Sequence, residues 1–159
     1  MDSASRNFIE QMGIIAQRSG SPRISGRISG LLILRGEPVA LQEIADTLQV
    51  SKASVSTNAR LLRDRGMLRL TTVPGERQDY YELVPNPFQS MLDLLSKEMQ
   101  QAAEDIQQSL SLFDDSQPDA RERVAGVQKF YQGSAIFLND IAQKLADQPI
   151  DRPDRGESQ

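Results

Sequence analysis

The sequence predicts a mainly α-helical protein with one small β-hairpin, followed by a pair of long helices. Two short apolar stripes at helical spacing lie between residues 38 and 66, and a Pro-Gly turn joins two strand-like segments directly after them. From residue 88 onward, apolar residues recur every three or four positions over much longer stretches. A chain of 159 residues is long enough to bury one compact core and to carry such a helical appendage.

Two helices are predicted before the central region. The first begins at the candidate caps Asp2 and Ser3 and runs to about Arg18. Its apolar stripe consists of Phe8, Ile9, Met12, Ile15 and Ala16. The second helix starts with Pro22 in its first turn and ends between residues 36 and 38, at a Gly and a Pro.

Two glycines lie four residues apart in the second helix. Gly26 and Gly30 each cost about 1 kcal/mol relative to Ala in a helix, which favours a site where another helix crosses closely. A phosphate-binding loop is excluded because no Gly-Lys-Ser or Gly-Lys-Thr follows. Arg27 lies between the glycines, and both a buried anchor and a phosphate contact remain open for it.

The central region reads as two short helices joined by a tight turn. Each helix has an apolar face, formed by Ile44, Ala45 and Leu48 in the first and by Val55, Ala59 and Leu62 in the second. Ala45 is small enough for two crossing helices to approach closely, and Val50 supplies an apolar side chain to the turn. Ser51 has the side-chain oxygen that an N-cap needs. This spacing is typical of a helix-turn-helix.

The opposite face of the second helix is small, polar and basic. A step of about 100° per residue places Ala53, Ser56, Thr57 and Arg60 outward, with Lys52 and Ser54 near the N-terminal end. A helix that enters the major groove of DNA needs a slim N-terminal half with hydroxyls and cations. An ordinary solvated face of an amphipathic helix shows the same pattern, so the helix alone does not distinguish the two.

A predicted hairpin follows this helix. Gly66 ends the helix in the left-handed conformation, and MLRLTTV and DYYELV read as two strands around the turn at Pro74 and Gly75. Val39 adds a short strand beside the hairpin, and Arg77 lies just past its tip. Together these elements predict a winged helix-turn-helix whose hairpin, the wing, reaches the minor groove or a flanking phosphate. With the wing included, the sequence favours binding to double-stranded DNA over a merely solvated helix.

Three segments carry a family resemblance over roughly residues 8 to 95. The chain resembles the winged-helix transcriptional regulators of the MarR superfamily, in particular its GbsR branch, in the segments RSGSPRISGRISGLLIL, SKASVSTNARLLRDRGML and PGERQDYYEL. The resemblance implies a dimeric, cytoplasmic, ligand-responsive transcription factor. It places family recognition-helix positions on Ser51, Ser56, Asn58 and Arg60, with Arg77 in the wing. Ala40 departs from the usual Ser or Thr cap, which costs about 1 kcal/mol, and Leu61 stands where the family tends to be charged.

The residues and the resemblance together give one candidate set and one candidate ligand class. The DNA-binding candidates are Lys52, Ser54, Ser56, Thr57, Asn58, Arg60 and Arg77. The resemblance also implies a small-molecule effector, an osmolyte or a quaternary amine. The aromatic rings that can cage such a cation are Tyr80, Tyr81, Phe130 and Tyr131. The competing interpretation is that these rings belong to the core.

The pattern changes to long helices beyond residues 85–87. The first apolar seam consists of Phe88, Leu92, Leu95, Met99, Ala102, Ile106, Leu110 and Phe113. After a break at residues 114–118, the second consists of Val124, Val127, Tyr131, Leu138, Ile141 and Leu145, widened by Ala125, Phe130 and Phe137. Two long seams without a third partner predict a helical hairpin that pairs with a second copy, as a homodimer. The alternative is a hairpin folded over the winged domain.

These observations divide the chain into three parts. Residues 1–86 form the predicted DNA-binding domain, residues 87–147 the dimerisation hairpin, and residues 148–159 a disordered tail with almost no apolar content. The net charge of −4 is unevenly spread, because residues 1–86 contain 11 Lys and Arg against 9 Asp and Glu, whereas residues 87–159 contain 7 against 13. An acidic half would repel DNA and help to orient docking, and an ordinary solvated helical surface accounts for the same charge.

Composition excludes several functional classes. The chain has no cysteine and no histidine, which removes disulfides, thiolate nucleophiles and the common zinc sites. The remaining carboxylates form no catalytic constellation, so we expect neither an enzyme nor a cofactor or metal. No apolar run reaches 18 residues, so we expect no membrane association and a cytoplasmic location. The functional alternative to DNA binding is a winged-helix adaptor that binds protein.

Overall fold

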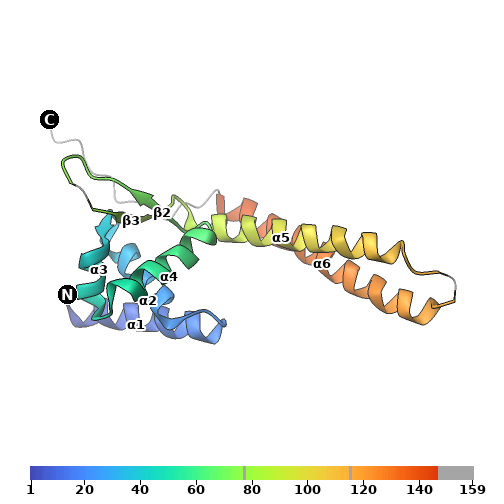
Figure 1. The fold of residues 1–159 in the computed structure, drawn as a ribbon. Coiled ribbons are helices and arrows are strands. Elements are labelled where there is room, and N and C mark those ends of the chain that lie inside the picture. The colour runs from blue at the N-terminus through green and yellow to red at the C-terminus, as the bar shows by residue number, and fades with distance from the viewer. Residues whose placement is uncertain (77, 115, 147–159) are drawn as a thin grey trace. The chain divides into compact units, whose positions relative to one another are not determined.

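The computed structural model describes residues 1–76, 78–114 and 116–146 and divides into two compact units. The first unit spans Met1–Pro87, and the second begins at Phe88. The elements follow the order α1, α2, β1, α3, α4, β2, β3, α5 and α6 (Figure 1). A mainly helical chain with a small antiparallel sheet and long C-terminal helices is the fold class predicted from the sequence, and that prediction is confirmed.

The first two helices begin and end near the predicted signals. Helix α1 (Ser3–Arg18) starts after Asp2, whose carboxylate accepts a hydrogen bond of 2.7 Å from the Ser5 N–H. That bond holds the pKa of Asp2 below its usual value. Helix α2 (Arg23–Arg35) ends at Gly36, which adopts a φ of +63°. Pro22 occupies the N-cap of α2, one residue before the predicted first turn.

Glycines set the close approach of α1 and α2. A Cβ atom at Gly26 would lie 2.2 Å from the Met12 carbonyl oxygen and 2.6 Å from the Ala16 Cβ. A Cβ at Gly30 would lie 3.2 Å from the Ile9 Cα. The predicted packing role of both glycines is therefore confirmed, because α1 occupies the space that a side chain would need.

Helices α3 (Leu41–Leu48) and α4 (Lys52–Asp64) form the helix-turn-helix. Ala40 occupies the N-cap of α3 without a side-chain hydrogen bond, as predicted. The apolar faces of α2, α3 and α4 meet in one core, whose almost fully buried members include Ile28, Leu31, Ile44, Leu48, Val55 and Ala59. The short strand β1 (Val39–Ala40) precedes α3.

The sheet has the strand order β1, β3, β2 and is antiparallel throughout. Strand β2 (Leu68–Thr71) pairs with β3 (Tyr80–Leu83), with Leu68 opposite Leu83. Between α4 and β2, Gly66 has a φ of +71° and the Met67 N–H donates to the Leu62 carbonyl at 3.0 Å. This 6→1 bond is that of a Schellman motif, which ends the helix and directs the chain into the sheet.

The wing turns where the sequence predicts. Gly75 adopts a φ of +87°, and the Glu76 N–H donates to the Val73 carbonyl at 3.0 Å. A positive φ at the third residue of such a turn is typical of type II, which Pro74 and Gly75 favour. The winged helix-turn-helix predicted from the sequence is therefore present in the first unit.

The second unit consists of α5 and α6. Helix α5 (Pro87–Leu110) ends three residues before the predicted end of its seam, and α6 (Pro118–Ala146) starts at the last residue of the predicted break. The Ser96 Oγ donates to the Ala135 carbonyl at 2.8 Å. The described helices include none with the length and hydropathy that a membrane crossing requires. The tail predicted to be disordered, 148–159, lies outside the described residues.

Candidate nucleic-acid interface

Helix α4 is the element that would enter a DNA groove, and we call it the recognition helix. The Ser51 Oγ accepts a hydrogen bond of 3.1 Å from the Ser54 N–H and so caps its N-terminus. The inner face of this helix is formed by Val55, Ala59 and Leu62, which are buried with exposures of 0%, 0% and 3%. These contacts fix the rotation of the helix about its axis, and therefore which side chains face outward.

The outward face of α4 contains most of the candidate set. Lys52, Ala53, Thr57 and Arg60 are exposed, and Ser54 and Ser56 are half-buried at the edges of this face. The face is narrow at the N-terminal end of the helix because its central residues are small. Two cations and a hydroxyl are therefore presented on a surface slim enough for the major groove of B-DNA, which is about 12 Å wide.

Asn58 is placed differently from the other candidates. It is 7% exposed, and its Nδ2 donates to the Ser54 carbonyl at 2.8 Å, while its buried Oδ1 has no hydrogen-bond partner among the described residues. The side chain thus lies along its own helix rather than on the outward face. The recognition position that the resemblance implies for Asn58 therefore lies on the buried flank of α4, and its contact with DNA stays a prediction.

Arg63 is an outward cation that the sequence reasoning missed. It follows Arg60 by three residues, and its side chain is 49% exposed, with its Nε 4.0 Å from the Asp64 carboxylate. Burial raises the pKa of Tyr81, with Asp79 adding to the rise, and the charges of Arg63 and Arg60 oppose it. Arg63 lies in the last turn of α4, shortly before the chain enters β2. The three-residue spacing from Arg60 was the signal that could have identified Arg63.

Two other basic residues of the first unit are engaged with protein groups. The Arg65 Nη1 donates to the Ser21 Oγ at 2.6 Å, which ties the end of α4 to the loop between α1 and α2. The Arg69 Nε donates to the Glu82 carboxylate at 2.8 Å across strands β2 and β3. The number of basic residues in the sequence therefore exceeds the number whose positive charge is not already paired with a protein group.

The wing has its own hydrogen-bond network near the tip. The Tyr80 hydroxyl donates to the Glu76 Oε2 at 2.5 Å, and the Gln78 Nε2 donates to the same oxygen at 2.9 Å. These two bonds lower the pKa of Glu76, and the bond to Glu76 raises the pKa of Tyr80. The network ties the Glu76 carboxylate back to the strand. Arg77, the predicted DNA contact of the wing, lies outside the described residues.

Arg27 is an anchor inside the first unit. Its Nη2 donates to the Leu48 carbonyl at 2.9 Å, and its side chain is 21% exposed. Its Nε lies 2.8 Å from the Glu10 Oε1, although the N–H does not point along that line, so the contact is an ion pair rather than an aligned hydrogen bond. Of the two interpretations left open by the sequence, the structure shows the anchor.

The aromatic residues considered for a cation cage belong to different units. Tyr80 and Tyr81 are buried in the first unit, with exposures of 9% and 6%. Phe130 and Tyr131 lie on α6, with ring centroids 5.6 Å apart and an interplanar angle of 84°. Neither unit therefore holds all four rings by itself, and the first pair is accounted for by the core.

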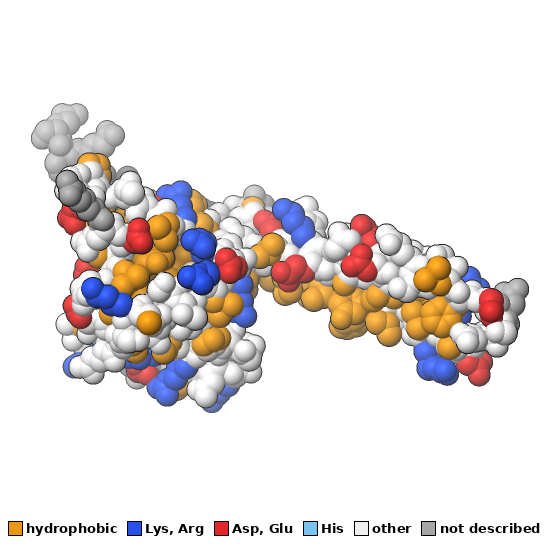
Figure 2. Space-filling model, viewed as in Figure 1, with side chains coloured by type: hydrophobic (Ala, Val, Ile, Leu, Met, Phe, Trp, Pro, Cys, Tyr) orange, Lys and Arg blue, Asp and Glu red, His pale blue; other side chains and the backbone are white. Residues whose placement is uncertain are grey.

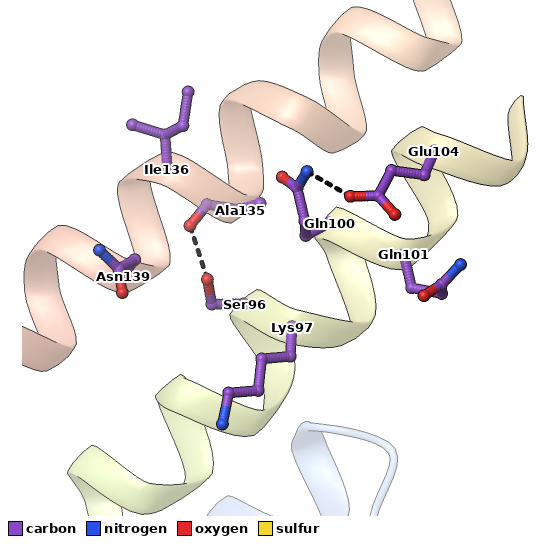
Figure 3. A pocket seen from close by; sticks show the side chains of 8 residues that line it. All are labelled: Ser96, Lys97, Gln100, Gln101, Glu104, Ala135, Ile136 and Asn139. Atoms are coloured by element: carbon purple, nitrogen blue, oxygen red, sulfur yellow. Dashed lines mark hydrogen bonds between the residues drawn. The ribbon is translucent and has the colours of Figure 1, made fainter. Parts of the chain in front are cut away.

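A groove of about 490 Å³ lies between α5 and α6 (Figure 3). The bond from Ser96 to Ala135 crosses it, and the Gln100 Nε2 donates to the Glu104 Oε1 at 2.8 Å along its α5 side. Its remaining lining residues are Lys97, Gln101, Ile136 and Asn139. Most of the side chains that line the groove are polar, and none of the sequence candidates lines it.

The α5–α6 hairpin also exposes large apolar side chains. Val127, Phe130, Ile136 and Phe137 have exposures of 48%, 66%, 65% and 64%. Figure 2 shows hydrophobic side chains gathered along one face of this hairpin. The Phe residues were predicted to widen the seam of α6, but within one copy of the chain they do not face α5. We call Val127, Phe130 and Phe137, which share one face of α6, the apolar strip.

Comparisons with known proteins agree with this geometry. A model of the MarR family matches residues 31–79, from within α2 to the residue before β3. The chain is 38% identical over 82 residues to the HTH-type transcriptional regulator MmpR5 of Mycobacterium tuberculosis, covering 51% of this chain and 50% of the relative. It is 26% identical over 96 residues to the putative HTH-type transcriptional regulator YvaV of Bacillus subtilis, covering 60% and 54%.

A further relative and a solved structure extend the similarity. The HTH-type transcriptional repressor OpcR of Bacillus subtilis is 23% identical over 96 residues, covering 60% of this chain and 52% of the relative. The chain thus spans about half the length of the curated relatives it matches. A crystal structure of a transcriptional regulator superposes with a TM-score of 0.80 at 25% identity, covering 91% of this chain and 99% of that one. These comparisons show similarity to the MarR family over residues 31–79 and to the fold of a solved transcriptional regulator over most of the chain.

Proposed function

We propose that this chain is a sequence-specific transcriptional regulator that binds double-stranded DNA as a homodimer. The observation that carries the proposal is the outward face of α4, where Lys52, Thr57 and Arg60 surround small residues on a capped and firmly seated helix. Hydroxyls and guanidinium groups on such a helix can bind base edges in the major groove. The names of the relatives, all transcriptional regulators, support the same function.

The basic residues have two proposed roles, contact with base edges and contact with phosphates. Arg60, on the outward face, can form the paired hydrogen bonds to guanine that are the commonest specific contact. Lys52 at the helix start and Arg63 toward the sheet are better suited to phosphates, which fix the register of a protein on DNA. Residues 51–77 contain 6 basic against 2 acidic residues. This local excess supports DNA binding despite the net charge of −4.

The apolar strip supports homodimerisation through the second unit. Large apolar side chains exposed together on one helix face often mark an interaction site, and a closed two-fold dimer is the commonest way for a chain to cover them. We assign DNA binding to residues 1–86 and dimerisation to residues 87–147. A two-fold dimer presents two recognition helices, so the operator is a pseudo-palindrome with half-sites related by the symmetry of the protein.

The finer assignment concerns the branch of the family and its effector. The segments PGERQDYYEL and RSGSPRISGRISGLLIL support the GbsR-like branch, and with it a small-molecule effector such as an osmolyte or a quaternary amine. A ligand that prefers one spacing of the two recognition helices would change operator affinity by about 1–3 kcal/mol. Phe130 and Tyr131 are the aromatic pair on the proposed dimerisation helices that can contact a cation.

Selection of bound sequences from a random DNA pool tests the function directly. The recovered duplex and a scrambled duplex of the same composition are then titrated by fluorescence anisotropy at two salt concentrations. We expect tighter binding to the recovered duplex and a steep loss of affinity with salt for both. A pool that yields no enriched sequence, together with no binding to random duplex DNA at either salt concentration, would favour a winged-helix adaptor that binds protein.

A further inference from the structure

We infer that Arg27 is a positioning residue that holds the turn between α3 and α4 and thereby sets how the recognition helix meets DNA. The inference rests on the proposed function. Arg27 belongs to α2, outside the helix-turn-helix, yet its guanidinium reaches the end of α3. It therefore connects the supporting helices to the element that would read the sequence.

The contact is made at the C-terminus of α3. Leu48 is the last residue of that helix, and its carbonyl accepts the 2.9 Å bond from the Arg27 Nη2. The last carbonyls of a helix lack partners within the helix, and the negative end of the helix dipole favours a cation there. Arg27, on α2, thus supplies a hydrogen bond to the last residue of α3 and a positive charge near the negative end of its dipole.

The chain from this contact to the recognition helix is very short. Gln49 adopts a φ of +53°, a conformation that side chains disfavour, and the Val50 N–H donates to the Ala45 carbonyl at 3.0 Å. Ser51 follows directly as the N-cap of α4. With three residues between the last residue of α3 and the first of α4, a shift of the Leu48 carbonyl is transmitted to the start of the recognition helix.

Helix α1 holds Arg27 in the orientation that this contact needs. The Glu10 Oε1 lies 2.8 Å from the Arg27 Nε, and the Glu10 Oε2 accepts a 2.6 Å bond from the Arg23 Nη2. Arg23 and Arg27 lower the pKa of Glu10, so the carboxylate is charged at neutral pH. A Cβ at Gly13 would lie 2.8 Å from the Arg27 Cγ, so this glycine leaves the space that the arginine stem occupies.

Arg23 provides a matched control for the experiment. It binds the same carboxylate from the same helix, but its side chain is 51% exposed and its bond is made to Glu10 alone among the described residues. Arg23→Gln and Arg27→Gln each remove one positive charge and one contact to Glu10. They differ in the bond to Leu48, so a difference between the variants reports on that bond.

The test compares both variants with the wild-type full chain on the recovered duplex and on its scrambled counterpart. We expect Arg27→Gln to reduce the ratio of the two affinities by about tenfold, within the range found for residues that couple to a site without touching its ligand. Arg23→Gln should leave the ratio unchanged. The slope of log K against log salt should be the same for all three proteins, because a positioning residue releases no counterions.

Two binding results would overturn the inference. A fall in the salt slope of roughly 1.8 for Arg27→Gln would mean that Arg27 neutralises a phosphate in each half of a dimer. An equal loss of discrimination in both variants would mean that the Glu10 network, and not the Leu48 contact, is what matters. If Arg27→Gln does not fold, as judged by circular dichroism, Arg27→Lys keeps the charge but lacks the guanidinium fork and takes its place.

Hydrogen exchange without DNA separates this inference from the proposed function. The amides of Gln49 and Val50 donate within the turn, at 3.3 Å and 3.0 Å, and should exchange faster in Arg27→Gln than in Arg23→Gln. Unchanged exchange there would overturn the anchoring role even if DNA binding is intact. A wild-type chain that binds no duplex would instead refute the proposed function, while exchange still decides whether Arg27 holds the turn.

Discussion

The two units of this chain bury their apolar residues to very different extents. In the first unit, Ile9, Ile28, Leu31, Ile44 and Val55 are at most 1% exposed, so a complete core exists within a single copy. In the described part of the second unit, the buried apolar residues are Ala103, Leu110, Ala135 and Ala142, mostly small ones, while Phe130 and Phe137 remain about two-thirds exposed. A helical pattern in the sequence therefore predicts a helix in both units but does not say what its apolar face will contact.

The largest effect should come from truncating the core of the first unit. Ile28→Ala removes a fully buried side chain and should lower the free energy of unfolding by about 2–5 kcal/mol, because it loses buried area and leaves a cavity. Urea denaturation followed by circular dichroism measures this loss. Leu34→Ala, at a position 45% exposed on the same helix, should change stability by no more than about 0.5 kcal/mol. Equal losses at both positions would contradict the described core.

A charge on the apolar strip should act on assembly rather than on folding of the single chain. Phe137→Asp should weaken dimerisation by about 2 kcal/mol or more, which is about 30-fold, because buried aromatic residues dominate interface energies. Sedimentation velocity at micromolar concentration measures the shift toward monomer. Gln132→Asp, at an exposed polar position of the same helix, is the control. Sedimentation of the wild-type chain as a monomer would rule out the proposed interface.

Loss of a contact from the recognition helix should reduce specificity, whereas loss of a contact from the wing should reduce affinity for any duplex. Thr57→Ala and Arg60→Ala should weaken the specific site more than random DNA, by about 1–3 kcal/mol for each lost base contact. Arg77→Ala should weaken both and lower the salt slope by roughly 1.8 in a dimer. Titration of each variant on both duplexes across a salt series tests this. If Arg77→Ala alone abolished the preference for the specific duplex, the wing and not α4 would determine sequence specificity.

The smallest expected effects concern the caps of the helix-turn-helix. Ser51→Ala removes the oxygen that binds the Ser54 N–H and should cost about 1 kcal/mol of stability. Ala40→Ser offers a cap that α3 lacks and should recover up to about 1 kcal/mol. Thermal melts of both variants give the comparison. An Ala40→Ser variant less stable than wild type would mean that the pairing of β1 leaves no room for the hydroxyl.

Most of the fold of the first unit could be predicted because its signals are local. Asp2, Ser51, Gly36, Gly66 and Gly75 act within four residues of their own positions, through caps and positive φ angles, so their effect is visible in the sequence. The close approach of Gly26 to α1 was also predictable, because a helix rarely tolerates two such glycines without a neighbour.

The candidate site was only partly predictable because side-chain direction depends on tertiary packing. The helical period shows which face a residue belongs to, but it cannot show that the Asn58 amide turns back to the Ser54 carbonyl. The partner of Arg27 is 21 residues away, so sequence alone could not choose between an anchor and a phosphate contact. Arg63 had a visible signal in its spacing from Arg60, and that signal was overlooked.

The alanine-rich contact between α5 and α6 has a consequence for how the protein assembles. Small residues such as Ala135 and Ala142 bring the helices close but gain little from burial, so most of the hydrophobic free energy available to the hairpin resides in its uncovered face. If a second copy covers that face, each protomer acts as a ligand for the other, and protein concentration enters the folding equilibrium by mass action. On dilution, a protease should then cut the hairpin at a concentration where the winged helix still resists.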